Sequence, residues 1–223
     1  MLIIEVMSDQ TNGILDKSIE KKEFRRQIKQ RLEENKAKFA IESQAVCEKL
    51  LTDNAFSEAS VVLAYMPLPD EVDILPVIKA AMVDGKKVAI PRIIEETHDT
   101  ICAQNAGKML FYYLDDASDI IRQTKEGYCG IAEPSGKNRQ FSCDDDFDNV
   151  LVLVPGRAFT KNGARLGRGK GFYDRFLSQL INDCSAAGKK VYTIGVCFSC
   201  QLVDSVPTEQ NDISVDRIVS FSD

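Results

Sequence analysis

VLVLVPG at residues 150–156 and GARLGRGKGFYD at residues 163–174 carry most of the information about the fold. The five consecutive apolar residues from Val150 to Val154 are typical of a strand that is buried on both faces, and Pro155-Gly156 ends it. After the glycine-rich loop, the apolar spacing from Phe172 to Cys184 predicts a helix. A strand, a loop and a helix in this order are the unit of an α/β protein with a parallel sheet.

The remainder of the chain continues this alternation. Helical spacing of apolar residues runs through Ser18–Leu51, as two helices broken near Asn35, and through Ile74–Met82, where Gly85 closes the helix. Strands are expected at Val61–Tyr65, at Val88–Ile90 (stopped by Pro91), at Val191–Val196 and at Ile218–Phe221, and Lys108–Leu114 is compatible with another. We therefore predict a three-layer α/β/α fold, in which a mostly parallel sheet carries helices on both faces.

The 223 residues suit one domain, which we place at residues 18–223. We expect residues 1–17 to form a disordered extension. The apolar opening Met1–Met7 is interrupted by Glu5 and lacks the basic start of a signal peptide. No apolar run approaches the length needed to span a bilayer, so we expect no membrane contact, and we expect a monomer.

Composition narrows the compartment and the partners. Seven irregularly spaced cysteines fit a reducing environment better than a disulfide framework, which predicts a cytoplasmic protein. The pair Cys197 and Cys200 ends an apolar run instead of preceding a helix, and we interpret both residues as incidental thiols. A formal net charge of −6 and a pI of about 5.0 disfavour nucleic acid as a partner.

Two further features indicate no chemistry of their own. The only histidine, His98, lies in a polar segment, residues 95–99, that is typical of a surface loop. A Ser-His-Asp mechanism or a multi-histidine metal site would depend on it alone, which argues against histidine chemistry. The acidic triplet Asp144–Asp146 lacks the spaced oxygen ligands of a calcium loop, and we interpret it as a solvated loop.

The loop after the Val150–Val154 strand has the composition of a phosphate-binding site. Glycines at alternate positions from 167 to 171 allow sharp turns and let backbone N–H groups approach a ligand. Arg165, Arg168 and Lys170 place three positive charges within six residues, and the following helix presents its N-terminus to an anion. The spacing matches neither a Walker A loop nor the dinucleotide-binding Gly-x-Gly-x-x-Gly motif, and a flexible basic turn is the alternative.

In this segment the chain resembles the 5-formyltetrahydrofolate cyclo-ligase family, also called the 5,10-methenyltetrahydrofolate synthetases. The shared pattern is Val154–Phe159 followed by Gly163-x-Arg165-Leu166-Gly167-x-Gly169-x-Gly171-x-Tyr173-Asp174. Shorter matches follow in the order expected of the family, at Lys21–Arg25, Asp70–Asp73, Ile90–Arg92, Gly130–Pro134, and Asn211-Asp212 with Asp216. The resemblance thus runs from about Lys21 to the C-terminus.

The resemblance implies an enzyme that uses ATP and Mg²⁺ to close 5-formyltetrahydrofolate into 5,10-methenyltetrahydrofolate, with release of ADP and phosphate. In the scheme accepted for the family, ATP phosphorylates the formyl oxygen, N10 attacks the activated carbon, and phosphate leaves. Catalysis of phosphoryl transfer depends mainly on positioning and on charge stabilisation, so it needs cations more than a histidine base. The residue inventory of this chain fits that demand.

The resemblance also implies roles for individual residues. Arg165, Arg168 and Lys170 would be catalytic, and Asp174 and Asp212 would hold Mg²⁺. ATP would contact Lys21, Lys22, Arg25, Arg165, Leu166, Gly167, Arg168, Gly169, Lys170, Gly171, Phe172 and Tyr173. The folate would contact Met66, Glu71, Arg168, Gly169, Lys170, Gly171 and Phe172, with Glu71 accepting hydrogen bonds from the pterin or holding the N5–N10 region.

Two departures from the family pattern bear on the site. Many relatives carry histidine where this chain has Asn211, which leaves the role of that position open. Because the chain has no tryptophan, an aromatic surface for folate must come from Phe or Tyr, and Tyr112, Tyr113 and Tyr128 are available. Two alternative functions also remain open: a folate- or nucleotide-binding regulator of the same fold without turnover, and an α/β enzyme that acts on sugar phosphates without ATP.

Overall fold

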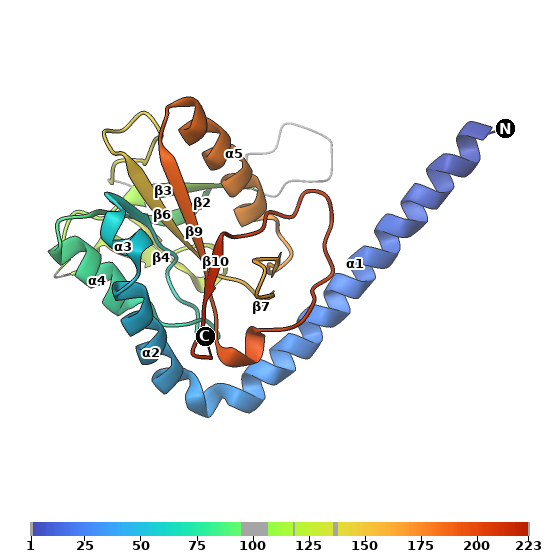
Figure 1. Cartoon of the computed structure of the whole chain (residues 1–223), viewed down its shortest axis with the longest axis horizontal. Coiled ribbons are helices and arrows are strands. Elements are labelled where there is room, and N and C mark those ends of the chain that lie inside the picture. Colours follow the sequence, from blue (N-terminus) through green and yellow to red (C-terminus); the bar gives the residue numbers. More distant parts are fainter. Residues whose placement is uncertain (1, 95–106, 118, 136–137, 223) are drawn as a thin grey trace.

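The computed structural model describes residues 2–94, 107–117, 119–135 and 138–222, without the side chains of residues 2–16 and residue 129. The loop predicted around His98 lies outside these residues. A six-stranded sheet forms the centre of the molecule, in the order β10-β9-β6-β1-β2-β3 (Figure 1). Its strands are β1 (Val61–Leu63), β2 (Lys87–Ile94), β3 (Lys108–Tyr113), β6 (Asn149–Val154), β9 (Lys190–Val196) and β10 (Arg217–Val219).

The topology of this sheet creates one place suited to a ligand. Neighbouring strands run parallel except for the antiparallel pair β2 and β3. From β1 the chain proceeds to β2 on one side, and from β6 it proceeds to β9 on the other, so the winding reverses between β1 and β6. In open α/β sheets the crevice for ligands forms at such a switch point, outside the carboxyl ends of the strands.

Helices cover both faces of the sheet, which confirms the predicted fold class. On one face Val62 and Leu151 share a hydrophobic core with α1 (Leu2–Asn35), α2 (Phe39–Leu51), α3 (Asn54–Glu58) and α4 (Leu75–Val83). On the other face Val61 and Val150 pack with α5 (Phe172–Ala186). Adjacent residues of one strand point to opposite faces, so the unbroken apolar run of β6 feeds two cores.

The first helix differs from the prediction in its start and agrees with it in its end. Helix α1 begins at Leu2, and its N-terminal part extends away from the body of the molecule (Figure 1). It ends at Asn35, where the short 3₁₀ helix η1 (Lys36–Lys38) separates it from α2, as the predicted break requires. The division into an extension at residues 1–17 and a single domain at residues 18–223 stays a prediction.

Pro91 does not stop β2, contrary to the prediction. The strand continues to Ile94 and pairs with β3 throughout, with Pro91 opposite Phe111. The carbonyl of Phe111 accepts a hydrogen bond from Phe141 on the outer side of β3, so the pair of Pro91 and Phe111 is not hydrogen-bonded across the ladder. The missing N–H of Pro91 faces the side of β1, whose pairing with β2 ends at Leu63 opposite Ala89, so the proline interrupts no pairing that the two strands make.

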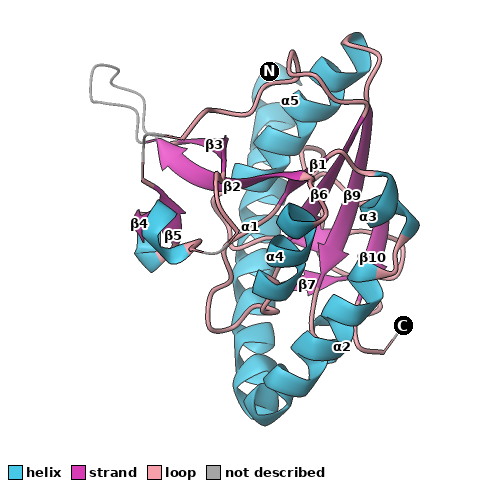
Figure 2. Cartoon of the chain, turned by 90° about the vertical axis from the view of Figure 1, so that its left-hand side faces the viewer, coloured by secondary structure: helices cyan, strands magenta, loops and turns pink. Residues whose placement is uncertain are grey.

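Smaller elements complete the edge where the ligand crevice is expected. An antiparallel pair, β4 (Thr124–Glu126) and β5 (Ala132–Pro134), lies beside the far end of β2 (Figure 2). A second pair, β7 (Ala158–Phe159) and β8 (Arg165–Leu166), forms within the loop after β6. The remaining 3₁₀ helices are η2 (Ile121–Gln123), η3 (Tyr128–Gly130) and η4 (Ser199–Gln201).

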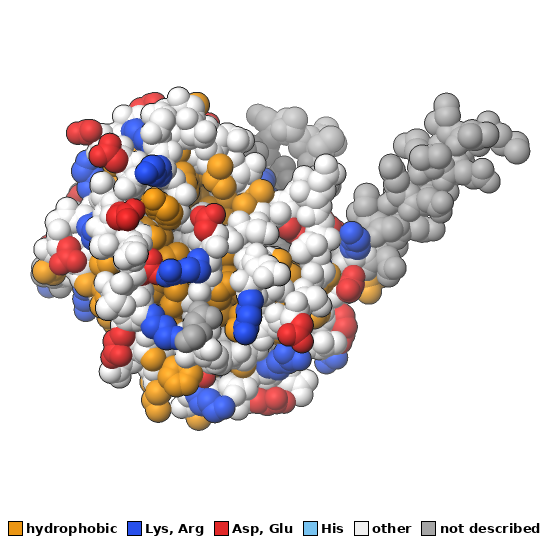
Figure 3. Space-filling model, in the orientation of Figure 1, with side chains coloured by type: hydrophobic (Ala, Val, Ile, Leu, Met, Phe, Trp, Pro, Cys, Tyr) orange, Lys and Arg blue, Asp and Glu red, His pale blue; other side chains and the backbone are white. Residues whose placement is uncertain are grey.

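The described surface carries charged side chains of both signs. On the face shown in Figure 3, basic and acidic side chains are interspersed. The predicted solvated loop is confirmed for Asp144 and Asp146, which are exposed. It is wrong for Asp145, whose side chain is 11% exposed and accepts hydrogen bonds from Tyr113 and from the N–H of Ser142. None of the helices in the described part of the chain combines the length and the apolar character needed to cross a membrane.

Candidate active site

A cavity of about 680 Å³ lies at the carboxyl ends of β1 and β6, where the topology predicts a ligand site. The loop after β1 contributes Met66, Asp70 and Glu71 to its lining, and the loop after β6 contributes Gly156 and Arg157. The glycine-rich loop and the start of α5 form a further wall, and α1 and the β4–β5 region close the sides. Segments far apart in the sequence therefore surround one cavity.

The glycine-rich loop is held in place by its own flanks. Gly171 caps α5 in the left-handed conformation, with φ of 64°, a backbone geometry that other residues adopt at a cost. Arg165 leaves β8 with a side chain that is only 3% exposed, and its Nη2 donates to Asp174 Oδ1 at 2.6 Å. The same guanidinium lies over the ring of Tyr173, at 5.7 Å from the centroid. Arg165 therefore joins the two ends of the loop.

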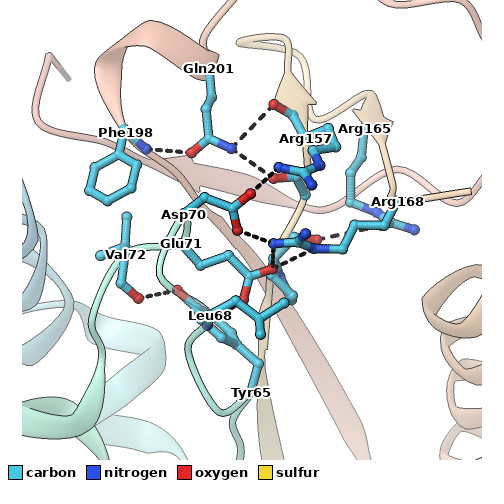
Figure 4. A network of polar contacts seen from close by, with 12 residues as sticks. Tyr65, Leu68, Asp70, Glu71, Val72, Arg157, Arg165, Arg168, Phe198 and Gln201 are labelled. Atoms are coloured by element: carbon cyan, nitrogen blue, oxygen red, sulfur yellow. Dashed lines mark hydrogen bonds and ion pairs between the residues drawn. The ribbon is translucent and has the colours of Figure 1, made fainter. Parts of the chain in front are cut away.

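Arg168 is engaged by the acidic segment that follows β1. Its Nε and Nη2 donate to Glu71 Oε1 at 3.0 and 2.8 Å, and Nη2 also contacts Asp70 (Figure 4). Asp70 in turn forms an ion pair with Arg157. Burial alone would raise the pKa of Asp70, but the two guanidinium groups outweigh it and hold that pKa below its ordinary value. Asp70 is thus charged at neutral pH, and Asp70 and Glu71 together hold Arg168 at the cavity.

Gln201 supports the ion pair of Asp70 and Arg157 by binding the backbone of the turn after β6. Its side chain is buried, and Nε2 donates to the carbonyls of Gly156 at 2.8 Å and Arg157 at 3.2 Å (Figure 4). Its Oε1 accepts from the backbone N–H of Phe198 at 2.9 Å. Three polar groups of the turn after β6 and of η4 are satisfied by one amide, so Gln201 holds the backbone that carries Arg157.

Two basic residues of α1, Lys21 and Arg25, bind segments that follow in the C-terminal part of the chain. Lys21 is buried, and its Nζ donates to Asp212 Oδ2 at 2.6 Å and to Glu209 Oε2 at 2.9 Å. One helical turn later, Arg25 Nε donates to the carbonyl of Gly167 at 2.8 Å. Of the predicted residues of α1, Arg25 thus contacts the glycine-rich loop, Lys21 pairs with the predicted magnesium ligand Asp212, and Lys22 is exposed.

The two predicted magnesium ligands lie close to each other. Asp174 Oδ1 accepts from Arg165 and, at 3.2 Å, from the backbone N–H of Ile213, which directly follows Asp212. Among the described residues, the second oxygen of each aspartate accepts no hydrogen bond, and no group of three or more acidic, histidine or cysteine side chains is placed to hold a metal. Asn211 is exposed beside them.

The remaining predicted residues line the apolar part of the cavity or its rim. Met66 packs partly buried against the core, and Phe172 meets Tyr128 edge to face, with centroids 5.7 Å apart. Of the three tyrosines considered for an aromatic surface, Tyr128 is the one that lines the cavity. Lys170 is exposed at the rim and forms no ion pair within the described part of the chain.

Sequence reasoning did not single out Asp70, Arg157 or Gln201. Asp70 lies within the acidic segment that resembles the family pattern, so its position was a usable signal. Arg157 was signalled in the same way, because it lies within the matched segment after β6. Gln201 has no such signal, because only the fold brings η4 behind the turn that it supports.

Comparison with known proteins agrees with this geometry. Residues 17–220 match the model of the 5-formyltetrahydrofolate cyclo-ligase family. A 5-formyltetrahydrofolate cyclo-ligase of Mus musculus is 26% identical over 200 residues, which cover 89% of this chain and 92% of the relative. The corresponding Escherichia coli K12 enzyme is 27% identical, with 80% and 87% covered.

A solved structure is also similar. The 5,10-methenyltetrahydrofolate synthetase of Aquifex aeolicus is 25% identical, with a TM-score of 0.67, and the match covers 91% of this chain and 90% of that one. The family match extends over nearly the whole chain, including Lys21, Arg25 and the entire glycine-rich loop. The chain therefore belongs to the 5-formyltetrahydrofolate cyclo-ligase family and is an ATP-dependent ligase of that class.

Proposed function

We propose that the enzyme converts 5-formyltetrahydrofolate to 5,10-methenyltetrahydrofolate by ATP- and Mg²⁺-dependent phosphorylation of the formyl oxygen. The observation that carries this proposal is the convergence of Arg165, Arg168 and Lys170 on one cavity of an acidic chain, with Arg25 of α1 bound to the carbonyl of Gly167 in the same loop. An N-formyl amide is a poor electrophile, so ring closure needs activation. Phosphoryl transfer provides it and is catalysed mainly by fixed positive charge.

The nucleotide is proposed to lie along the glycine-rich loop. Arg25 contacts this loop from α1, Lys21 lies one helical turn before Arg25, and the N-terminus of α5 adds the positive end of a helix dipole. The backbone from Leu166 to Gly171 supplies N–H groups, with Phe172 and Tyr173 following. Lys170 has no ion-pair partner among the described residues. It is therefore available to stabilise the negative charge that develops on the transferred phosphoryl group.

Asp174 and Asp212 suit a magnesium ion that is held partly by its nucleotide. Each aspartate keeps one oxygen that accepts no hydrogen bond from the described residues. Magnesium is commonly bound through one or two carboxylates together with substrate phosphates and water, so two aspartates suffice. A bound ion of this kind would neutralise phosphate charge.

The folate is proposed to occupy the apolar part of the cavity, in contact with Met66, Phe172 and the segment from Arg168 to Gly171. Glu71 lies beside Arg168, so we place it at the N5–N10 region, where the formyl group reacts. We further propose that the protein is a cytoplasmic monomer, and the irregular spacing of its seven cysteines supports a reducing compartment.

The test is a spectroscopic assay with purified protein. The methenyl product absorbs in the near ultraviolet, and its absorbance should grow only when 5-formyltetrahydrofolate, ATP and Mg²⁺ are all present. ADP should form in an amount equal to the product. Folate binding without ADP release would contradict the proposal and favour a non-catalytic binding protein of the same fold.

A further inference from the structure

Glu133 is a buried carboxyl group at the cavity that forms no ion pair with the residues that the structure describes. It lies in β5, is 5% exposed and belongs to the cavity lining. Its Oε1 accepts from the backbone N–H groups of Ile93 at 3.1 Å and Tyr128 at 3.2 Å. Oε2 accepts no hydrogen bond from the described residues, and this oxygen is not fully buried. One oxygen is therefore fixed by the backbone, and the other is open.

This arrangement is unusual within the described part of the chain. Of the other buried charged residues there, Lys21, Asp53 and Arg165 each form an ion pair. Glu42 accepts from the N–H of Ser199 and is not part of the cavity lining. A buried charge is costly unless hydrogen-bonded or paired, so an open carboxylate oxygen at a cavity indicates that a ligand completes it.

The surroundings of Glu133 select the kind of ligand. Ile93, Met109, Ile131, Tyr128 and Phe172 line the same cavity, and the last two meet edge to face. Apolar and aromatic walls around one acceptor suit a flat heterocycle that presents N–H donors. The 2-amino-4-oxopyrimidine edge of a pterin presents two adjacent donors, the 2-amino group and N3–H.

Glu71, the residue that the sequence suggested for this contact, has both oxygens committed. Its Oε1 accepts twice from Arg168, and Oε2 accepts from the N–H of Leu68 at 3.0 Å. An acceptor already occupied by a guanidinium gains little from a further neutral donor. Glu133 is thus the better placed of the two carboxylates.

We propose that Glu133 recognises the donor edge of the pterin and so orients the folate, with Glu71 left to the N5–N10 region. The identity of the ligand rests on the proposed function. The backbone N–H groups of Ile93 and Tyr128 hold the carboxylate in one orientation, so that Oε2 accepts from the 2-amino group or N3–H. Glu133 acts in substrate recognition, and phosphoryl transfer depends on the cations around the glycine-rich loop.

The first test is the variant Glu133→Gln, which preserves shape. The side-chain amide oxygen of the variant would accept from the two backbone N–H groups. Its N–H₂ group would then face the donor edge of the pterin, where it cannot accept a hydrogen bond. The KM for 5-formyltetrahydrofolate should rise about 10- to 100-fold, as expected for losing a hydrogen bond to a charged group, while the KM for ATP changes less than about twofold. The exposed neighbour Glu126, changed to Gln, is the matched control and should leave both constants unaltered.

The second test measures binding without turnover. Calorimetry without ATP compares 5-formyltetrahydrofolate with an analogue that carries a methyl group in place of the 2-amino group. Wild-type protein should bind the analogue about 10-fold more weakly or worse, and Glu133→Gln should discriminate less than about threefold. Equal discrimination by both proteins, or a rise confined to the KM for ATP, would overturn the proposal.

Because the binding comparison needs no catalysis, it can succeed even if the enzyme assay shows no methenyl product. The proposed reaction and the proposed role of Glu133 can therefore fail separately. Thermal unfolding monitored by circular dichroism checks that the variants fold. Glu133→Asp, which keeps the charge but withdraws it by one methylene, serves as a second variant and should weaken folate binding in the same direction. Normal folate binding and discrimination by a folded Glu133→Asp would also overturn the proposal.

Discussion

Replacement of Gly163 by alanine should be among the most destabilising single-methyl additions in this protein. Gly163 has φ of 86°, and a Cβ at this position would lie 2.0 Å from the carbonyl oxygen of Val215. The two residues are also joined by a hydrogen bond of 2.9 Å from the N–H of Val215 to the carbonyl of Gly163. The added methyl group would therefore push apart two backbone segments that are bonded to each other.

The expected magnitude follows from these contacts. A left-handed conformation costs a residue with a Cβ about 1–2 kcal/mol. The overlap with backbone requires a displacement of the kind that costs about 1–3 kcal/mol in overpacked interiors, and the strained hydrogen bond adds about 1 kcal/mol. We expect a loss of about 3–6 kcal/mol, a large part of the roughly 5–15 kcal/mol that stabilises a domain.

Gly188→Ala is the matched control, because it isolates the conformational cost. Gly188 has φ of 70°, but an added Cβ there meets nothing within 4 Å. It should lose only about 1–2 kcal/mol in urea-induced unfolding followed by circular dichroism. If the two variants lose the same free energy of unfolding, steric contact with Val215 does not explain the glycine at position 163.

Three further predictions concern the site. Lys170→Ala should cost about 2–4 kcal/mol of transition-state stabilisation in steady-state kinetics, with little change in thermal unfolding because the side chain is exposed; an unchanged kcat and KM for ATP would remove Lys170 from the mechanism. The pKa of Asp70 is lower in the folded state than in the unfolded state, so its ion pairs stabilise the protein above about pH 4. This contribution is lost as the pH falls through the folded pKa. The difference in the free energy of unfolding between wild type and Asp70→Asn should therefore shrink over that range. Gln201→Glu removes the amide donor to two buried carbonyls and should lower the free energy of unfolding by about 1–3 kcal/mol, whereas the exposed control Gln179→Glu should not.

Local patterns were sufficient to predict most of the sheet and the helices. The five apolar residues of β6 need burial on both faces, and Gly85, with φ of 78°, follows the end of α4 as a helix-terminating glycine should. The prediction that Pro91 stops β2 is wrong because the effect of a proline on a strand depends on which side of the strand its missing N–H faces. Its tolerance depends on β1 ending early on one side, which the sequence of β2 does not reveal.

The pairing of charges within the site could not be predicted in the same way. From the sequence, the cations and the acids of the site were assigned separate roles. In the structure they pair, although Lys21 lies 191 positions from Asp212 and Arg168 lies 97 positions from Glu71. Such contacts are products of the strand order and leave no periodic signal. Glu133 shows the same limit: its buried, open carboxylate depends on how β5 packs against the end of β2.

These pairs have a consequence for nucleotide binding under the proposed function. Lys21 and Arg165, both expected to meet phosphates, are held by Asp212 and Asp174. A triphosphate that takes over either cation leaves an aspartate charge uncompensated, unless a divalent ion arrives with it. Asp174→Asn removes one competing carboxylate, so ATP without Mg²⁺ should bind this variant more tightly than wild type.

Calorimetry with ATP in a chelating buffer measures that gain directly, and we expect it to be about tenfold, or about 1.4 kcal/mol. The addition of Mg²⁺ should strengthen ATP binding more in wild-type protein than in Asp174→Asn, because only wild type has both aspartates to hold the ion. Weaker Mg²⁺-free binding by the variant would mean that Asp174 helps Arg165 to face the phosphates instead of competing for it. The ion pair would then be a fixed support of the site, because the 3% exposure of Arg165 leaves it little room to change partners.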